Sequence, residues 1–218
     1  MALFGNLFGK KGNGTDAIKD AAVGQNVEFG VFPQGKGGKK LSPISWQILE
    51  RKGDRVLLIS KYALACMPFN TAKTTWDGKI GWEKSSLRAW LNGEFLSRFF
   101  TPDEINRIAD TDVTADPNPD HRNIDPGSHT KDSVFLFSIQ EAEKYFPDKA
   151  SRMCQLSAFA IACGALSHKE YGRWWLRTPG YNQNRASCVE CDGEILTGGS
   201  EVDDGTSCCI RPALWVHT

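Results

Sequence analysis

The chain has 218 residues, of which 40% are hydrophobic and 11% aromatic, so it is long enough to bury a substantial core and has an ordinary globular composition. Lys and Arg total 26, as do Asp and Glu, and this zero net charge without a basic stripe argues against a nucleic-acid partner. No segment approaches the ~20 apolar residues of a membrane-spanning helix, and the N-terminus lacks the pattern of a signal peptide. We therefore expect a cytoplasmic protein with no integral membrane segment.

The sequence patterns of residues 1–60 predict a flexible leader followed by a β-sheet. Residues 1–24 are rich in Gly and Lys and have no sustained hydrophobic period, which predicts a flexible leader. Apolar residues then alternate with period two over 27–32 and 44–49, and a continuous apolar run covers 55–60. These patterns predict three successive antiparallel strands joined by Gly-containing turns.

Helices are predicted next. Apolar residues at helical spacing indicate a helix over 85–99. Thr101, Pro102 and Glu104 then form a capping box with Pro at the first helical position, which predicts a short helix reaching Ile108.

Residues 112–132 are rich in Asp, Pro, His and Asn and predict a long irregular loop of the kind that is often functional. A strand is expected over 134–137, and a second capping box, Ser138 with Glu141, predicts the helix that follows. A further helix is expected over 149–166.

The C-terminal 45 residues consist of two apolar blocks, which we call the frame, and a polar insert between them. The frame consists of residues 174–180 and 210–216, which are mostly apolar, whereas the residues between them are rich in Asn, Ser, Thr, Gly, Asp, Glu and Cys. Packed scaffolds commonly carry binding loops in this way. Short strands are expected at 188–189 and 193–196, between Gly turns. Because strands stand at both ends of the chain with helices between them, we expect one α+β domain over residues 25–218, with its terminal strands in one sheet.

The seven cysteines do not indicate a disulfide framework, because their number is odd and no export signal precedes them. Cys188 and Cys191 have the spacing of half a zinc site. The adjacent Cys208 and Cys209 do not complete it, because neighbouring side chains on a strand point to opposite faces. Cys154 and Cys163 are expected to be small core residues. We expect no metal or other cofactor.

Motifs for catalysis are also missing from the sequence. It contains no G-x-S-x-G elbow, no phosphate-binding loop of Walker spacing and no helical His pair, so no catalytic residue is assigned.

Several aromatic and basic residues have two interpretations. Trp76, Trp82 and Trp90 could line a carbohydrate or peptide groove, but their spacing is more typical of a core. Arg177 and Arg211 stand beside apolar residues of the frame, which favours buried bonds to backbone or carboxylate groups over ligand binding.

Sequence blocks from residue 26 to the end resemble a bacterial and phage domain family of uncharacterised function. The blocks are Phe29-Gly30, Ile44-Ser45-Trp46, Leu57-Leu58-Ile59-Ser60, Pro68-Phe69-Asn70, Ser86-Leu87-Arg88-x-Trp90-Leu91-Asn92, Val134-Phe135-Leu136-Phe137-Ser138, Trp175-Leu176-Arg177-Thr178-Pro179-Gly180 and Ile210-Arg211-Pro212-Ala213-Leu214. That family resembles C-type-lectin-like domains of the formylglycine-generating-enzyme type, and the resemblance implies this α+β fold. One departure is Cys209, where the family usually has Gly.

Some proteins of that shape are the variable products of diversity-generating retroelements, in which a C-terminal segment is rewritten at adenine-derived codons while the frame is kept. The resemblance implies a display segment at about 174–216. The predicted ligand-binding residues are Tyr181, Asn182, Asn184, Arg185, Ser187, Cys188, Glu190, Cys191, Asp203, Asp204, Thr206 and Ser207. The expected ligand is a protein or peptide, because a shallow mixture of Tyr, Asn, Ser and Arg suits adaptable protein contacts.

The leading hypothesis is therefore a non-enzymatic ligand-binding module. The alternative is a copper- or iron-dependent oxidising enzyme on the same scaffold, in which Cys188 and Cys191 would stand in for the paired cysteines of the formylglycine-generating type. A structural or regulatory domain of phage origin is a third interpretation. Similarity of fold alone does not decide between these functions.

Overall fold

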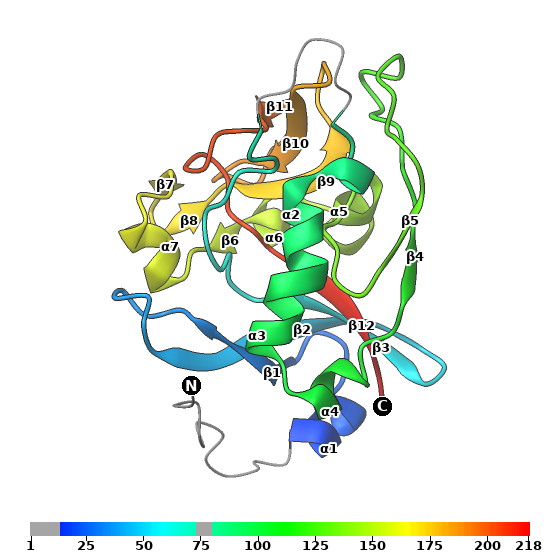
Figure 1. The fold of residues 1–218 in the computed structure, drawn as a ribbon, viewed down its shortest axis with the longest axis vertical. Coiled ribbons are helices and arrows are strands. Elements are labelled where there is room, and N and C mark those ends of the chain that lie inside the picture. The colour runs from blue at the N-terminus through cyan, green and yellow to red at the C-terminus, as the bar shows by residue number, and fades with distance from the viewer. Residues whose placement is uncertain (1–13, 73–79) are drawn as a thin grey trace, which may run out of the picture.

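The two ends of the chain meet in one antiparallel sheet in the computed structural model, which describes residues 14–72 and 80–218 (Figure 1). The order of the strands is β1-β2-β3-β12, with bounds Asn26–Pro33, Leu41–Lys52, Arg55–Ser60 and Ala213–His217. The protein is thus a mixed α+β fold, and the predictions of three antiparallel strands and of a sheet shared by the terminal strands are confirmed.

A helical run packs on the β1–β2 part of this sheet. It comprises η1 (Trp82–Lys84), α2 (Ser86–Trp90), the π-helical turn η2 (Leu91–Phe95) and α3 (Leu96–Phe99). Phe100, which follows the run, lies with its ring centroid 5.4 Å from that of Phe29 and 6.5 Å from that of Trp46. The Trp46 indole N–H, which is buried, donates a hydrogen bond to the backbone carbonyl of Phe29. The polar group of this buried side chain therefore has a partner.

The predicted helix over 85–99 ends at Phe99 as expected, whereas the short helix after Thr101 begins as predicted and ends earlier. The side chain of Thr101 caps α4 (Pro102–Ile105) in the predicted capping box with Glu104. The helix ends at Ile105 rather than Ile108, because Ile108 instead forms an antiparallel bridge with Val216.

The predicted irregular loop contains a short hairpin at its base. The strands β4 (Thr111–Val113) and β5 (Thr130–Asp132) pair antiparallel. Residues 134–137 are buried as expected of a core strand, but only Phe135 has strand-type pairing, in a bridge with Ala213. The helix α5 (Ile139–Tyr145) then begins with the predicted capping box of Ser138 and Glu141.

The prediction of one helix over 149–166 is wrong. The chain forms α6 (Lys149–Arg152), β6 (Cys154–Gln155) and α7 (Ala158–Ala162), followed by β7 (Ser167–His168) and β8 (Tyr171–Gly172), with β8 between β6 and β7. Met153 leaves the helical conformation, and the Ser157 hydroxyl accepts from Ala160 to cap a new helix. Cys154 is therefore buried on a strand, whereas Cys163 is exposed rather than in the core.

Part of the predicted leader is helical. The helix α1 (Gly14–Asp20) carries Ile18, whose side chain is fully buried. Arg51 on β2 holds this helix against the sheet, since its guanidinium donates to the Ile18 carbonyl at 2.6 Å. Residues 1–13 and Trp76 lie outside the described residues. Trp82 is buried and Trp90 packs against the core, in agreement with the core interpretation.

A disulfide joins Cys66 to Cys209, across 143 residues of sequence, so the expectation of no disulfide is wrong. The two cysteines also form an antiparallel backbone bridge, which brings the loop after β3 to the segment before β12. Disulfides persist mainly in oxidising compartments, so this bond favours a location outside the reducing cytoplasm over the predicted cytoplasmic one. Among the described helices, none combines the length and the hydropathy needed to cross a bilayer.

Removal of this disulfide should destabilise the fold strongly, because the bond closes a very long loop in the unfolded chain. For the double variant Cys66→Ser/Cys209→Ser we expect the free energy of unfolding to fall by about 2–5 kcal/mol in urea titrations. Wild-type protein in excess dithiothreitol should match the variant. Equal stability of oxidised wild type and variant would contradict a structural role of the bond.

Candidate functional site

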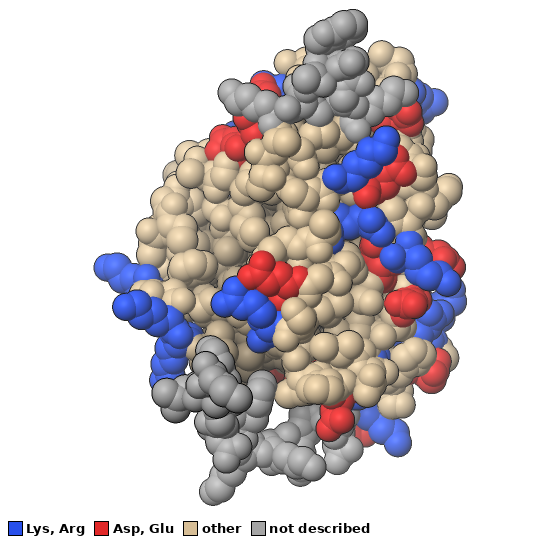
Figure 2. All heavy atoms as spheres, in the orientation of Figure 1, with Lys and Arg blue, Asp and Glu red and all other residues tan. Residues whose placement is uncertain are grey.

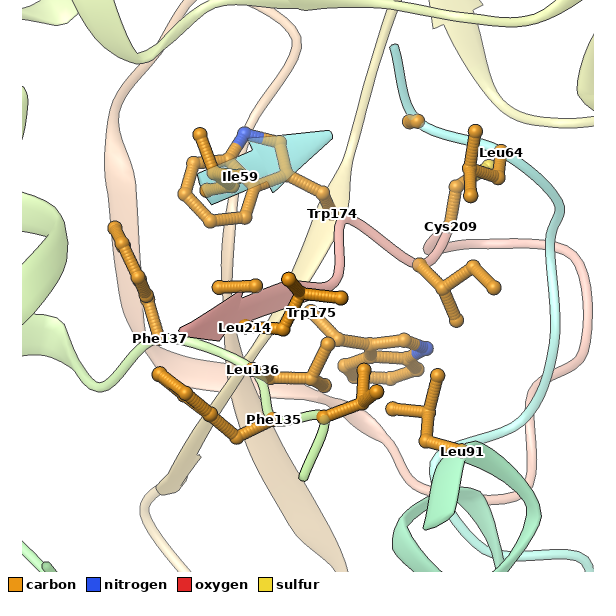
Figure 3. Packing of buried hydrophobic residues seen from close by; sticks show 14 of the residues in the cluster. Ile59, Leu64, Leu91, Phe135, Leu136, Phe137, Trp174, Trp175, Cys209 and Leu214 are labelled. Carbon is orange, nitrogen blue, oxygen red and sulfur yellow. The ribbon is translucent and has the colours of Figure 1, made fainter. Parts of the chain in front are cut away.

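The centre of the candidate site is β9 (Trp174–Pro179), every residue of which is buried. Its two tryptophans point in opposite directions (Figure 3). The Trp174 ring meets Phe146 at 6.5 Å between centroids, and Trp175 meets Phe69 at 5.8 Å. Each indole N–H donates to a backbone carbonyl, that of Arg152 and of Met67 respectively. The strand is therefore fixed on both of its faces.

β9 is the edge of a three-stranded antiparallel sheet of order β11-β10-β9, in which β10 is Arg185–Val189 and β11 is Ile195–Glu201. β10 and β11 together contain 12 of the 29 residues of the polar insert, 181–209. The insert is therefore more regular than the two short strands predicted from its sequence. The turn between β9 and β10 covers residues 180–184 and stands at one end of this sheet, near the top of Figure 1.

Arg177 connects this sheet to the loop between β4 and β5. Its buried guanidinium donates to the carbonyls of Leu136 at 2.8 Å and Thr114 at 3.0 Å, and it forms ion pairs with Asp116 and Glu141. These contacts confirm the predicted buried bonds to backbone and carboxylate groups. A planar guanidinium suits this role, because it presents several donors in a fixed geometry.

Arg211 is also buried, but its partners among the described residues include no carboxylate. Its guanidinium lies against the Phe146 and Trp174 rings, 4.7 and 4.9 Å from their centroids, and donates to the Ser60 carbonyl. Burial lowers the pKa of Arg211. The residue thus supports the frame through stacking rather than through an accessible charge.

Asn118 is a positioning residue that the sequence analysis missed. It is fully buried, and its side-chain amide donates to the carbonyls of Pro179 at 2.7 Å and Thr197 at 2.8 Å. It thereby ties the loop 114–129 to the sheet at the β9–β10 turn. A possible signal was its place between Pro117 and Pro119, which restricts the backbone on either side.

Close backbone approach shapes this turn. The register of β10 shifts between Ala186 and Cys188 in its pairing with both neighbours, which marks a bulge. Gly199, with φ +76°, faces this bulge, and a Cβ there would lie 2.4 Å from the Ala186 carbonyl oxygen. Gly180 is similarly confined, because a Cβ would lie 2.4 Å from the Gly198 carbonyl oxygen.

The turn presents a polar and aromatic surface, the Tyr181 patch, which consists of His121, Tyr181, Asn182, Asn184, Arg185 and Glu201. Tyr181 is 49% exposed, and the Arg185 guanidinium lies 5.0 Å from the centre of its ring. Arg185 also donates to the Gly199 carbonyl and pairs with Glu201. The His121 ring meets Tyr181 edge-on at 6.2 Å.

Asn182 shapes the turn itself, since its side-chain oxygen accepts from the Asn184 N–H at 2.9 Å. Both asparagines remain partly exposed. Four of the predicted binding residues, Tyr181, Asn182, Asn184 and Arg185, are thus brought together.

Two predicted residues are buried beneath this surface. The Ser187 hydroxyl donates to the Pro179 carbonyl at 3.0 Å, and the Cys188 thiol lies 3.7 Å from the Ser200 hydroxyl. Both side chains have no exposed area. They stabilise the sheet from within.

Glu190 and Cys191 lie just beyond the opposite end of β10, five and six residues from Arg185, which is roughly 16–20 Å at the usual rise per strand residue. Glu190 pairs with Arg173 at 2.6 Å, and the Cys191 thiol contacts the Leu166 carbonyl at 3.8 Å. The predicted residues therefore divide into two separate surfaces.

Asp203, Asp204, Thr206 and Ser207 belong to the loop that follows β11. The Asp204 carboxylate accepts from the backbone N–H of Thr206 at 2.8 Å and of Ser207 at 3.1 Å, and these bonds lower the pKa of Asp204. The Thr206 carbonyl accepts from the Leu166 N–H, so this end of the loop lies beside Cys191. Asp203 is partly exposed.

Cys188 and Cys191 contact different partners, although their spacing is that of a metal knuckle. The first thiol faces Ser200 and Cys208 inside the sheet, and the second faces Leu166. Within residues 14–72 and 80–218, no group of three or more His, Cys, Asp or Glu side chains is placed to hold a metal ion.

The fold and site define a class of protein: an α+β domain in which a buried C-terminal frame supports a polar sheet end. Residues 53–218 match the model of the family described as "Domain of unknown function (DUF6273)", and the chain belongs to this family. Comparisons with curated proteins and with solved structures gave no match. The matched region begins after β1 and β2, which nevertheless complete the sheet formed by β3 and β12.

The glycines of the turn provide a matched pair for testing its geometry. Gly199→Ala should lower the free energy of unfolding by about 2 kcal/mol or more, because the new methyl group meets backbone and the residue has positive φ. Gly198→Ala is the control, since its Cβ meets only the Tyr181 ring, at an ordinary 3.6 Å. Chemical denaturation measures both. Equal effects of the two substitutions would contradict the bulge geometry.

Proposed function

We propose that this protein is a non-enzymatic protein-binding module whose ligand surface is the Tyr181 patch. The observation that carries the proposal is the half-exposed Tyr181 ring, held between Arg185 and His121 above a fully buried frame. Tyr and Arg supply much of the binding energy at protein interfaces, and Tyr does so with little loss of conformational entropy.

The contacts beneath the patch favour binding without rearrangement. Asn118 and Ser187 both bond to the Pro179 carbonyl, one residue before the turn begins. Arg185 is held by Gly199 and Glu201 while its guanidinium covers the Tyr181 ring. A surface that is already ordered loses less entropy on binding, which increases the affinity available from a small patch.

The surface charge favours a protein ligand over nucleic acid. Arg185 and Glu201 give the patch both signs of charge, and His121 adds a polar aromatic ring. On the face drawn in Figure 2, Lys and Arg are likewise interspersed with Asp and Glu. Recognition by nucleic-acid-binding proteins relies on a basic excess.

A C-type-lectin-like fold of the formylglycine-generating-enzyme type is part of the proposal. Its support is the sheet shared by the terminal strands and the burial of both motif blocks, residues 174–179 and 210–214. As a variable protein of a diversity-generating retroelement, the chain would change at exposed positions of the 181–184 turn. Ser187 and Cys188 would belong to the frame, because their burial leaves no surface for a ligand.

The competing hypothesis is a copper- or iron-dependent oxidising enzyme that uses Cys188 and Cys191. It requires the two thiols to converge, whereas they contact different parts of the structure. Elemental mass spectrometry of protein purified without added metal tests this hypothesis. Near-stoichiometric metal, lost in Cys188→Ala and Cys191→Ser variants, would favour the enzyme.

Site-specific photo-crosslinking tests the ligand surface. A photoreactive phenylalanine analogue at position 181 should crosslink a discrete protein partner in cells, whereas the same analogue at Leu41 should not. Leu41 is the matched control, because it is an exposed apolar residue, 38% accessible, on the distant strand β2.

An excess of the Arg185→Ala variant as competitor should leave the crosslink at position 181 in place, whereas excess unlabelled wild type should suppress it. Identical crosslinks from positions 181 and 41, or none from position 181, would contradict the proposed surface.

A further inference from the structure

Two free thiols lie close together in the interior of the protein, away from the Tyr181 patch. Cys188 on β10 and Cys208, next to the disulfide-bonded Cys209, are both fully buried and unoxidised. The two side chains interact with each other, and the Cys188 thiol lies 3.7 Å from the Ser200 hydroxyl. Neither thiol takes part in the proposed ligand surface.

The backbone fixes both partners of this pair. Cys188 is paired with Trp175 across the β9–β10 ladder. On the other side, the Cys209 N–H donates to the Arg173 carbonyl at 2.9 Å, and Trp175 donates back to the Cys209 carbonyl at 3.0 Å. Since Cys209 is also bonded to Cys66, Cys208 directly precedes an anchored residue.

The surroundings shift the pKa values of the two thiols in opposite directions. The interaction with Cys208, opposed by burial and assisted by Ser200 and Arg173, lowers the pKa of Cys188. Burial and the neighbouring Cys188 raise the pKa of Cys208 well above its usual range. Thiolate character is what initiates thiol–disulfide exchange, so Cys188 is the better nucleophile of the pair.

We propose that Cys188 and Cys208 form a redox-active pair that closes to a second disulfide beside Cys66–Cys209. A low-molecular-weight disulfide such as oxidised glutathione is the oxidant. The Cys188 thiolate attacks one of its sulfur atoms and releases one glutathione thiolate, and Cys208, after loss of its proton, displaces the second from the mixed disulfide. The protein loses two protons and two electrons, and the glutathione disulfide becomes two thiols.

Closure would tie the loop after β11 to the centre of the sheet. The new bond encloses residues 189–207, which include all of β11 and the Asp204 loop. Because both thiols are buried, exchange requires local opening of residues 202–208, and the rate should be limited by that opening. The inference does not depend on the proposed ligand surface.

Disulfide mapping in glutathione redox buffers tests the proposal on the wild-type protein. After free thiols are blocked, cleavage after Glu190 and Glu201 separates Cys188 from Cys208, whereas Cys208 and Cys209 stay together. In oxidising buffer we expect one species that joins the Cys66, Cys188 and Cys208-Cys209 peptides. The melting temperature should rise by roughly 6–12 °C as this species forms.

Two variants make the test specific. Cys208→Ser should release the Cys188 peptide from the joined species, whereas Cys191→Ser, which alters a half-buried thiol in the same hairpin, should leave it intact. The proposal would be overturned if Cys188 and Cys208 stay free while the exposed Cys163 is glutathionylated, because the oxidant was then active. The same holds if the Cys188 peptide joins Cys191 instead.

Discussion

The structure depends on a strand that is buried on both faces. β9 sends Trp174 into one layer and Trp175 into the other, and its two indole N–H groups and the Arg177 guanidinium all bond to backbone carbonyls. The strand pairs with β10 along one edge and with Cys209 along the other. A strand held in this way cannot slip by one residue without exchanging which tryptophan enters which layer, so its register determines where the chain turns at Gly180.

This constraint explains how the protein can combine an exposed aromatic residue with a stable fold. The 180–184 turn follows directly after the buried strand, and Asn118 fastens the long β4–β5 loop to the same carbonyl that Ser187 uses. Tyr181 therefore projects from a turn whose preceding backbone carbonyl, that of Pro179, already accepts hydrogen bonds from Asn118 and Ser187. The far end of β10, with Glu190 and Cys191, is held separately by Arg173 and Leu166, which is why the polar insert forms two surfaces rather than one.

Local patterns in the sequence predicted much of the fold. The features that they did not predict depend on contacts between residues far apart in the sequence. Alternation over 27–32 and the capping boxes at Thr101 and Ser138 depend only on residues close in sequence, and the structure contains the strand and both helix starts that they predict. The 149–166 segment also has helical spacing, but pairing of β6 with β8 takes priority over it. The Cys66–Cys209 bond and the role of Asn118 join residues that no local pattern relates. Ser187 was predicted to lie on the surface because serine is usually exposed. Its hydroxyl is buried because it bonds to the carbonyls of Pro179 and Thr197, and the sequence does not show these partners.

The buried frame should tolerate few substitutions, whereas the exposed turn that it supports should tolerate many. A saturation-mutagenesis library over residues 174–213, sorted by resistance to proteolysis, measures this tolerance position by position. We expect most substitutions to be accepted at Tyr181 and Gln183, and few at Trp174, Trp175, Arg177 or Gly199. Equal intolerance at Tyr181 and at the frame positions would contradict this expectation, because the exposed ring would then be part of the fold rather than a surface that the fold presents.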